Sequence, residues 1–156
     1  MYLTRYSDYA LRTLIYLGLH RDRVCTVREI ADAYSISQSH LTKIVNQLGI
    51  LGLVATARGR AGGVRLGRAP EDISVGSVIR ETEQGLDLVE CFDLSTNTCP
   101  IAGCCSLARL LQQALDAFFE VLDGKTLADL LVSRRALLVR LAPASDALVV
   151  RRPSGP

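Results

Sequence analysis

The stretch that decides the fold is residues 26–66, TVREIADAYSISQSHLTKIVNQLGILGLVATARGRAGGVRL. It opens on a capping box, in which the Thr26 oxygen caps the start of a helix and Glu29 reaches back to it. A short helix is therefore expected from residue 27 to about residue 34, where SIS breaks the pattern. A second helix is expected from residue 38 to residue 48, and its buried stripe is Leu41, Ile44, Val45 and Leu48. Two short helices joined by a tight connection are typical of a helix-turn-helix.

A basic, glycine-rich hairpin follows the two helices. Residues 53–57, LVATA, are expected to form one strand, and residues 64–66, VRL, a second strand. The segment between them, RGRAGG, contains glycines that permit a flexible turn. A hairpin directly after a helix-turn-helix is a wing. The predicted fold class is therefore mainly α with a small β-hairpin wing, a winged helix-turn-helix.

Helical spacing recurs on both sides of this stretch. It predicts a first helix over residues 8–20, capped by Ser7 or Asp8. It also predicts a short helix over residues 75–83, capped by Ser74.

A regular apolar stripe begins at Leu107 and ends at the Asp-Gly pair at 123–124. It predicts a helix of roughly 16–18 residues whose apolar face is wide enough for a partner helix. Thr126 is expected to start a short last helix. No clear signal follows Arg135, and residues 143–156 are expected to be poorly ordered.

Charge divides the chain near residue 70. The 156 residues include 18 Lys and Arg and 16 Asp and Glu, a net charge of +2. Residues 1–70 contain ten basic and four acidic side chains, a net charge of +6, whereas residues 71–132 contain three basic and eleven acidic ones, a net charge of −8. This asymmetry indicates that the first part of the chain faces a nucleic acid.

The second helix of the helix-turn-helix carries polar side chains opposite its apolar stripe. Gln, Asn and Ser side chains contact base edges, and Lys and Arg suit phosphate. Most polar helix faces are only solvated, but the arginine-bearing wing and the +6 charge favour DNA binding here. The candidate DNA-binding residues are Gln38, Ser39, His40, Thr42, Lys43 and Asn46 of the helix and Arg58, Arg60 and Arg65 of the wing.

Four of the five cysteines, Cys91, Cys99, Cys104 and Cys105, lie within fifteen residues, and Cys25 stands apart. Their spacing is not the C-x2-C knuckle of a structural zinc site, and loosely spaced thiolates suit an iron–sulfur cluster. Spacing alone leaves iron–sulfur and zinc both open, beside inert thiols and an oxidised disulfide. Adjacent thiols rarely reach one centre, so only one of Cys104 and Cys105 is expected to bind metal. We expect Cys25 in the core.

Three cysteines leave such a metal site one ligand short. Asp93, Glu90, an exogenous group or a residue of another chain would fill the remaining position.

The opening residues lack the basic start and apolar core of a secretory signal. No apolar run approaches the roughly 18 residues that a membrane span needs. We therefore expect a cytoplasmic protein, in which thiols stay reduced. An enzyme is disfavoured because the sequence has no nucleotide-binding loop, no C-x2-C redox pair and only two histidines, His20 and His40.

Five separated motifs resemble the Rrf-type winged-helix regulators, and the resemblance covers residues 1–132. The motifs are MYLTRYSDYALR at 1–12, ISQSHLTKIV at 36–45, GRAGG at 59–63, CPIAGCCSL at 99–107 and TLADL at 126–130.

The resemblance implies a homodimer joined by the long helix, with one cluster per subunit and DNA binding that depends on the cluster. It is strongest to the nitric-oxide-sensing repressors of the family, in which three cysteines bind a 4Fe–4S cluster and an aspartate of the partner subunit's first helix completes it. The matching residues here are Cys91, Cys99, Cys105 and Asp8.

On this basis residues 1–70 are expected to be the DNA-binding domain, and residues 71–132 the iron–sulfur sensor loop and dimerisation helix, followed by a tail at 133–156. Regulators of iron–sulfur biogenesis in the same family hold a 2Fe–2S cluster with a histidine three residues after the last cysteine, where this chain has Ala108. An iron- or redox-sensing regulator with a 2Fe–2S cluster, and a zinc- or thiol-based DNA-binding regulator, are the alternatives.

Overall fold

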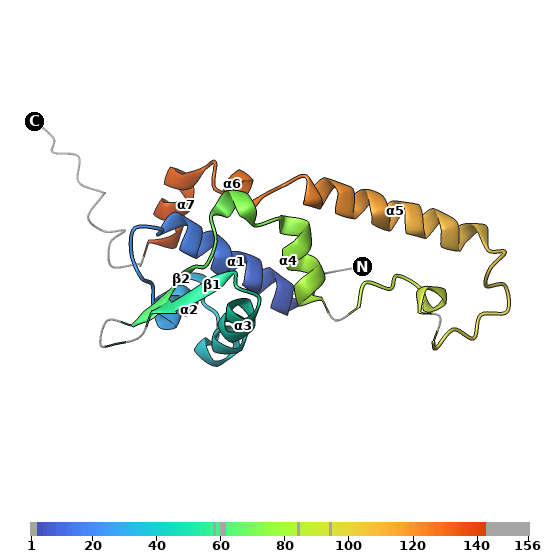
Figure 1. Ribbon diagram of the computed structural model, residues 1–156, viewed down its shortest axis with the longest axis horizontal. Helices are drawn as coiled ribbons and strands as arrows, with labels where there is room; N and C mark the ends of the chain where they lie inside the picture. Colours follow the sequence, from blue (N-terminus) through green and yellow to red (C-terminus); the bar gives the residue numbers. More distant parts are fainter. Residues whose placement is uncertain (1–2, 58, 60–61, 84, 94, 143–156) are drawn as a thin grey trace, which may run out of the picture.

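The structure is a computed structural model, and it describes residues 3–57, 59, 62–83, 85–93 and 95–142. Its elements are α1 (Arg5–Leu19), α2 (Val27–Tyr34), α3 (Gln38–Ile50), β1 (Val54–Ala57), β2 (Gly63–Leu66), η1 (Pro70–Asp72), α4 (Val75–Thr82), η2 (Glu90–Phe92), α5 (Ser106–Asp123), α6 (Leu127–Leu130) and α7 (Arg134–Leu141). All elements except α5 and η2 form one body, from which α5 extends to one side (Figure 1). The predicted fold class, mainly α with a β-hairpin wing, is confirmed.

Helix α1 begins earlier than its periodicity predicted. Thr4 is the N-cap, and its hydroxyl accepts a hydrogen bond from the Ser7 amide at 3.3 Å. The expected caps, Ser7 and Asp8, lie inside the helix. The apolar pattern missed the first turn because its inward-facing residue is Ser7, a fully buried side chain that accepts a hydrogen bond from Thr82.

Helices α2 and α3 form the predicted helix-turn-helix. Thr26 caps α2 by accepting a hydrogen bond from the Glu29 amide at 3.1 Å. Ser35 ends α2 in the left-handed region, at φ 53°, which turns the chain sharply toward α3. Ser37 stands at the N-cap of α3, but its hydroxyl lies 2.8 Å from that of Ser39 and makes no capping bond.

The wing is a two-stranded antiparallel hairpin, with Val54 opposite Leu66. Each strand begins and ends within one residue of its predicted position. The segment before α2 adds a bridge to this hairpin, because the Cys25 amide donates to the Val64 carbonyl at 2.9 Å and the Val64 amide donates back at 2.7 Å. The wing is therefore hydrogen-bonded to the start of the helix-turn-helix.

The core is centred on α1, which contacts α3, α4, α6 and β2. Leu14 and Leu17 of α1 are buried in the same cluster as Leu48 of α3, Val78 of α4 and Leu127 of α6. Short elements from the second half of the chain therefore complete the core of the winged helix.

Helix α5 is attached to the body through α4. The Arg80 guanidinium donates to both carboxylate oxygens of Asp123, at 2.6 and 2.7 Å, and lies 4.0 Å from the centre of the Phe119 ring. Phe119, the one buried residue of α5, packs on Val75 and Ile79. The opposite end of α5 points away from the body and joins the cysteine segment, residues 84–105 (Figure 1).

The last two helices differ in how well they were predicted. Helix α6 begins as expected, with a capping box between Thr126 and Asp129. Helix α7 was not predicted, because its position depends on distant contacts: Leu131, just before it, packs on Gly18 of α1, and Leu141 packs on the core. Residues 143–156, expected to be poorly ordered, lie outside the described residues. Among the described helices, none combines the length and apolar character needed to cross a membrane.

Gly63 allows the wing to approach the segment before α2. A Cβ atom at this position would collide with the Cys25 carbonyl oxygen and with Val24. We expect Gly63→Ala to lower the free energy of unfolding by about 1–3 kcal/mol, measured by urea denaturation.

Gly85→Ala is the matched control, because in the described part of the chain nothing lies within 4 Å of a Cβ atom placed there. We expect it to change the stability by less than about 0.5 kcal/mol. Equal stability of the two variants would contradict the close approach at Gly63.

Candidate DNA-binding surface and cysteine segment

Helix α3 presents the predicted polar face to solvent. Its apolar residues Leu41, Ile44, Val45 and Leu48 are buried in the core. The six candidate contact residues of this helix are all exposed, namely Gln38, Ser39, His40, Thr42, Lys43 and Asn46. One side of α3 therefore fixes the helix to the body, and the other side is open to a partner.

Two of these six side chains already form hydrogen bonds at the start of α3. The Thr42 hydroxyl donates to the Gln38 carbonyl at 2.8 Å, and the Ser39 hydroxyl is paired with Ser37. Gln38, His40, Lys43 and Asn46 are the other exposed candidates, and their contacts to bases or phosphate stay a prediction.

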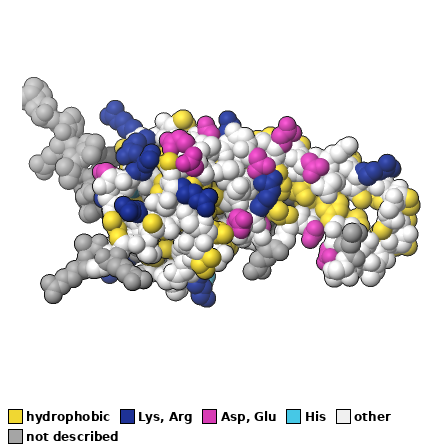
Figure 2. Space-filling view, in the orientation of Figure 1, with side chains coloured by type: hydrophobic (Ala, Val, Ile, Leu, Met, Phe, Trp, Pro, Cys, Tyr) yellow, Lys and Arg dark blue, Asp and Glu magenta, His cyan; other side chains and the backbone are white. Residues whose placement is uncertain are grey.

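The wing contributes one described basic residue of the three expected. Arg65 is exposed on β2, opposite Ala55 of β1. Arg58 and Arg60, also predicted to contact DNA, lie outside the described residues. Many of the Lys and Arg side chains seen in Figure 2 lie over the body of the molecule.

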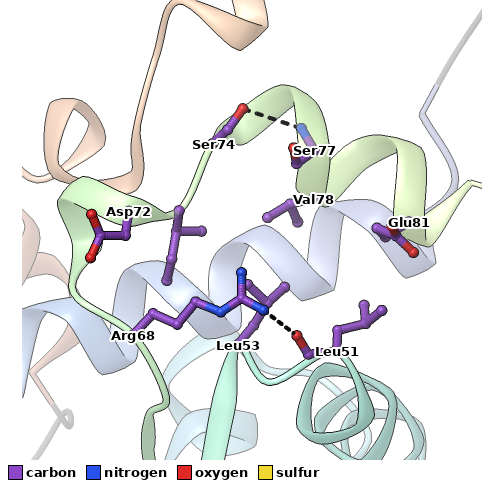
Figure 3. A pocket seen from close by; sticks show the side chains of 9 residues that line it. Leu51, Leu53, Arg68, Asp72, Ser74, Ser77, Val78 and Glu81 are labelled. Atoms are coloured by element: carbon purple, nitrogen blue, oxygen red, sulfur yellow. Dashed lines mark hydrogen bonds between the residues drawn. The ribbon is translucent and has the colours of Figure 1, made fainter.

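Arg68 connects the exit of the wing to the end of the recognition helix. Its guanidinium donates to the Leu51 carbonyl at 2.9 Å, directly after α3 (Figure 3). The bond runs along the wall of a cavity of about 220 Å³ between Leu53, Val78 and the start of α4. It restrains the relative position of α3 and the wing, the two parts predicted to contact DNA.

The cysteine segment contains three half-buried thiols, Cys91, Cys99 and Cys105, and the exposed Cys104. Cys105 is the N-cap residue of α5. Within the described ranges, no three histidine, cysteine or acidic side chains converge closely enough to hold a metal ion. The assignment of these cysteines as ligands therefore stays a prediction.

Two of the three carboxylates of the cysteine segment, those of Glu90 and Asp93, accept hydrogen bonds within it. Glu90 accepts hydrogen bonds from the amide and the hydroxyl of Thr98, both at 2.6 Å. Asp93 accepts from the Ser95 hydroxyl at 2.6 Å and from the Thr96 hydroxyl at 2.8 Å. Bonds from the Thr98 side chain and amide lower the pKa of Glu90, and bonds from Ser95 and Thr96 lower that of Asp93.

Asp8, expected as a ligand contributed by a partner subunit, lies in the first turn of α1, within the body. The part of the cysteine segment from η2 to the start of α5, which carries the cysteines, lies away from the start of α1 in this chain (Figure 1). The Asp8 carboxylate binds Arg12 through two contacts of 2.9 Å. Sequence reasoning missed Arg12, although a spacing of four residues on a helix is a known signal for such a pair.

Cys25 is fully buried in the core, as predicted. Burial raises the pKa of its thiol to about 12. A thiol held in the protonated form is a poor metal ligand, because metals bind the thiolate.

Sequence reasoning also missed Glu83 and Thr82, which bind the start of α1. No local signal marks them, since their partners Thr4 and Ser7 lie more than seventy residues away.

The fold and the exposed polar face of α3 define a winged helix-turn-helix DNA-binding protein. The chain belongs to the Rrf2 family, described as iron-dependent transcriptional regulators, whose model matches residues 3–133.

The chain is similar to regulators named NsrR over almost their whole length. It is 47% identical over 139 residues to the HTH-type transcriptional regulator NsrR of Bacillus subtilis strain 168, covering 88% of this chain and 95% of that one. It is 50% identical over 138 residues to the NsrR of Geobacillus kaustophilus strain HTA426, covering 88% and 94%. The expected resemblance to the family is therefore confirmed.

Solved structures of the same family share the fold. The B. subtilis CymR, titled the global cysteine regulator, superposes with a TM-score of 0.69 at 28% identity and covers 83% of this chain and 95% of its own. The T. potens IscR superposes with a TM-score of 0.67 at 25% identity and covers 99% and 94%.

Lys43 is placed to contact phosphate from the exposed face of α3. We expect Lys43→Ala to weaken binding by a similar factor on all duplexes and to lower the slope of log affinity against log salt by about 0.9 for each Lys43 that contacts the duplex. The measurement is fluorescence anisotropy with duplexes that the wild-type protein selects from a random library.

Lys125, the other lysine of the chain, lies in the turn after α5 and is the matched control. Lys125→Ala is expected to leave both affinity and salt slope unchanged. A Lys43→Ala protein with the wild-type salt slope would contradict the phosphate contact.

Proposed function

We propose that the protein is a dimeric, cytoplasmic DNA-binding repressor whose affinity for its operator is set by a 4Fe–4S cluster that reacts with nitric oxide. The observation that carries this proposal is a segment of three half-buried thiols that the fold holds apart from a winged helix-turn-helix. The similarity to regulators named NsrR at 45–50% identity supports it.

The proposed ligands are Cys91, Cys99, Cys105 and Asp8 of a second copy of the chain. The chemistry of the donor set suits the group, because thiolates are the usual ligands of iron–sulfur clusters. Cys105 stands at the N-cap position of α5 and makes no side-chain capping bond there. Glu90 and Asp93 are hydrogen-bonded within the segment and Asp8 is paired with Arg12, so any of these carboxylates would exchange its present partners to bind the cluster.

The exposed face of α5 supports the homodimer. Leu107, Leu110 and Val121 expose 59%, 61% and 67% of their surface, and Phe119 is the one buried residue of this helix. Yellow apolar side chains line α5 in Figure 2. An apolar stripe along an 18-residue helix is stable in water when a second helix covers it, and a second copy supplies a matching stripe.

DNA recognition follows from the geometry of α3. In helix-turn-helix proteins the second helix enters the major groove, and a dimer reads two half-sites about one helical turn apart. Gln38, His40 and Asn46 would contact base edges, whereas Lys43 and the arginines of the wing, Arg58, Arg60 and Arg65, would bind phosphates or the adjacent groove.

Through Asp8, the state of the cluster would affect DNA binding. When bound, the cluster supplies iron atoms that react with nitric oxide. A carboxylate is a harder ligand than a thiolate, and the iron of an iron–sulfur cluster would hold it less firmly. Asp8 would therefore be displaced more easily than the three cysteine ligands. Its loss would release α1 of one subunit from the cysteine segment of the other. Because two half-sites require a fixed spacing of two recognition helices, a small shift would weaken binding.

Anaerobic purification tests the proposal. We expect a coloured protein containing iron and sulfide, which loses affinity for a duplex it selected from a random library when nitric oxide is added. A colourless protein with stoichiometric zinc would overturn the cluster. A coloured protein that ignores nitric oxide would point instead to an iron- or redox-sensing regulator.

The adjacent cysteines provide a matched pair of variants. We expect Cys105→Ala to lose the visible absorption of the reconstituted protein, because a proposed thiolate ligand is removed. Cys104→Ala is expected to keep it, since Cys104 is exposed and its thiol donates to the Ile101 carbonyl at 3.2 Å. The reverse result would exchange the roles of the two residues.

Asp8→Ala tests the link between subunits. We expect this variant to retain cluster, to react with nitric oxide at an altered rate and to bind DNA at least about fivefold more weakly in the cluster-loaded state. Stopped-flow absorption and anisotropy measure the two effects.

Asp32→Ala is its matched control, because Asp32 also lies four residues from an arginine, Arg28, on a neighbouring helix. It is expected to behave as wild type. Identical nitrosylation kinetics and DNA affinity in Asp8→Ala would argue against the Asp8 ligand.

A further inference from the structure

The start of α1 is bound to the end of α4 by a glutamate. Glu83 accepts a hydrogen bond from the Thr4 amide at 2.8 Å and one from the Thr4 hydroxyl at 3.1 Å. Thr4 is the N-cap of α1, where amides lack partners within the helix. The negative charge of Glu83 also complements the positive end of the helix dipole. A residue 79 positions away therefore completes the cap of α1.

A second, buried contact strengthens this junction. The Thr82 hydroxyl lies 2.8 Å from the Ser7 hydroxyl and donates to it, and both side chains are almost completely excluded from solvent. Thr82 also contacts the Val78 carbonyl of its own helix at 2.7 Å. We call these four residues, Thr4, Ser7, Thr82 and Glu83, the α1–α4 junction.

The junction lies between three parts of the molecule that the proposed function must connect. Asp8 directly follows Ser7 in the first turn of α1. The cysteine segment begins directly after Glu83. Helix α1 packs on the recognition helix α3 as well as on α4.

We propose that Glu83 is a positioning residue that makes the Asp8-bearing turn of α1 and the root of the cysteine segment move together. This inference rests on the proposed function and assigns Glu83 no contact with the cluster. A displacement of either the Asp8 turn or the cysteine segment acts on the same four residues, and α1 passes it to α3. Each subunit thereby couples its own segment to the aspartate that it offers to its partner.

The first experiment measures how well the α1–α4 junction protects backbone amides in the metal-free protein. In metal-free Glu83→Ala protein we expect the Thr4 and Ser7 amides to exchange with solvent about five- to tenfold faster than in wild type, as followed by NMR. Glu83→Gln is expected to restore slow exchange, because its amide oxygen accepts the same two bonds. Glu81→Gln, on the exposed face of α4, is the matched control and is expected to change nothing.

The second experiment measures how strongly the state of the cluster changes the affinity for DNA. We expect the ratio of DNA affinities between the cluster-loaded and metal-free states to fall at least about fivefold in Glu83→Ala, while Glu83→Gln and Glu81→Gln keep the wild-type ratio. If Glu83→Ala does not fold, Thr82→Val takes its place, because it removes the buried hydroxyl at nearly constant volume. The same fall in the ratio of DNA affinities is expected.

The outcomes separate this inference from the proposed function. Unchanged exchange at Thr4 and Ser7 would overturn the junction regardless of the cluster. Faster exchange with an unchanged affinity ratio would reduce Glu83 to a stabilising role and overturn the proposal. A wild-type protein that binds no cluster would instead refute the proposed function, and faster exchange in Glu83→Ala would then support the mechanical link alone.

Discussion

The packing of α1 against α3, α4 and α6 is the contact on which the rest of the structure depends. Leu14 and Leu17 are almost fully buried, and the apolar faces of the neighbouring helices meet at these side chains. Burying such side chains is the main favourable contribution to folding a domain of this size. The recognition helix is therefore positioned by α1, the same helix that carries Asp8.

Specific contacts attach the wing and α5 to the body that α1 organises. The wing is fixed by the bridge between Cys25 and Val64 and by the bond from Arg68 to the Leu51 carbonyl. Helix α5 is fixed by Arg80, which holds Asp123 and covers Phe119. Between these two anchor points the α1–α4 junction joins the first turn of α1 to the root of the cysteine segment. From Glu83, where the cysteine segment begins, hydrogen bonds and packed side chains lead through α1 to α3.

The basic and acidic parts of the chain correspond to different parts of the structure. The basic residues before position 70 include the exposed Lys43 and Arg65 of the helix-turn-helix and wing, whereas Glu90 and Asp93 in the acidic part shape the cysteine segment. Asp8 is one of only four acidic residues in the basic part. Its carboxylate binds Arg12 on the surface of α1, where 43% of the Asp8 side chain is exposed.

The sequence by itself determined the order and type of most elements, the class of the fold and the polar face of α3. These features depend on caps and on periodicity over a few residues, such as Thr26 with Glu29 or the stripe from Leu41 to Leu48. Only the tertiary structure decided that Thr4 caps α1, that α7 exists and that Glu83 binds the start of α1. Those features depend on partners that lie far away in the chain, and no local pattern specifies which distant side chains folding brings together.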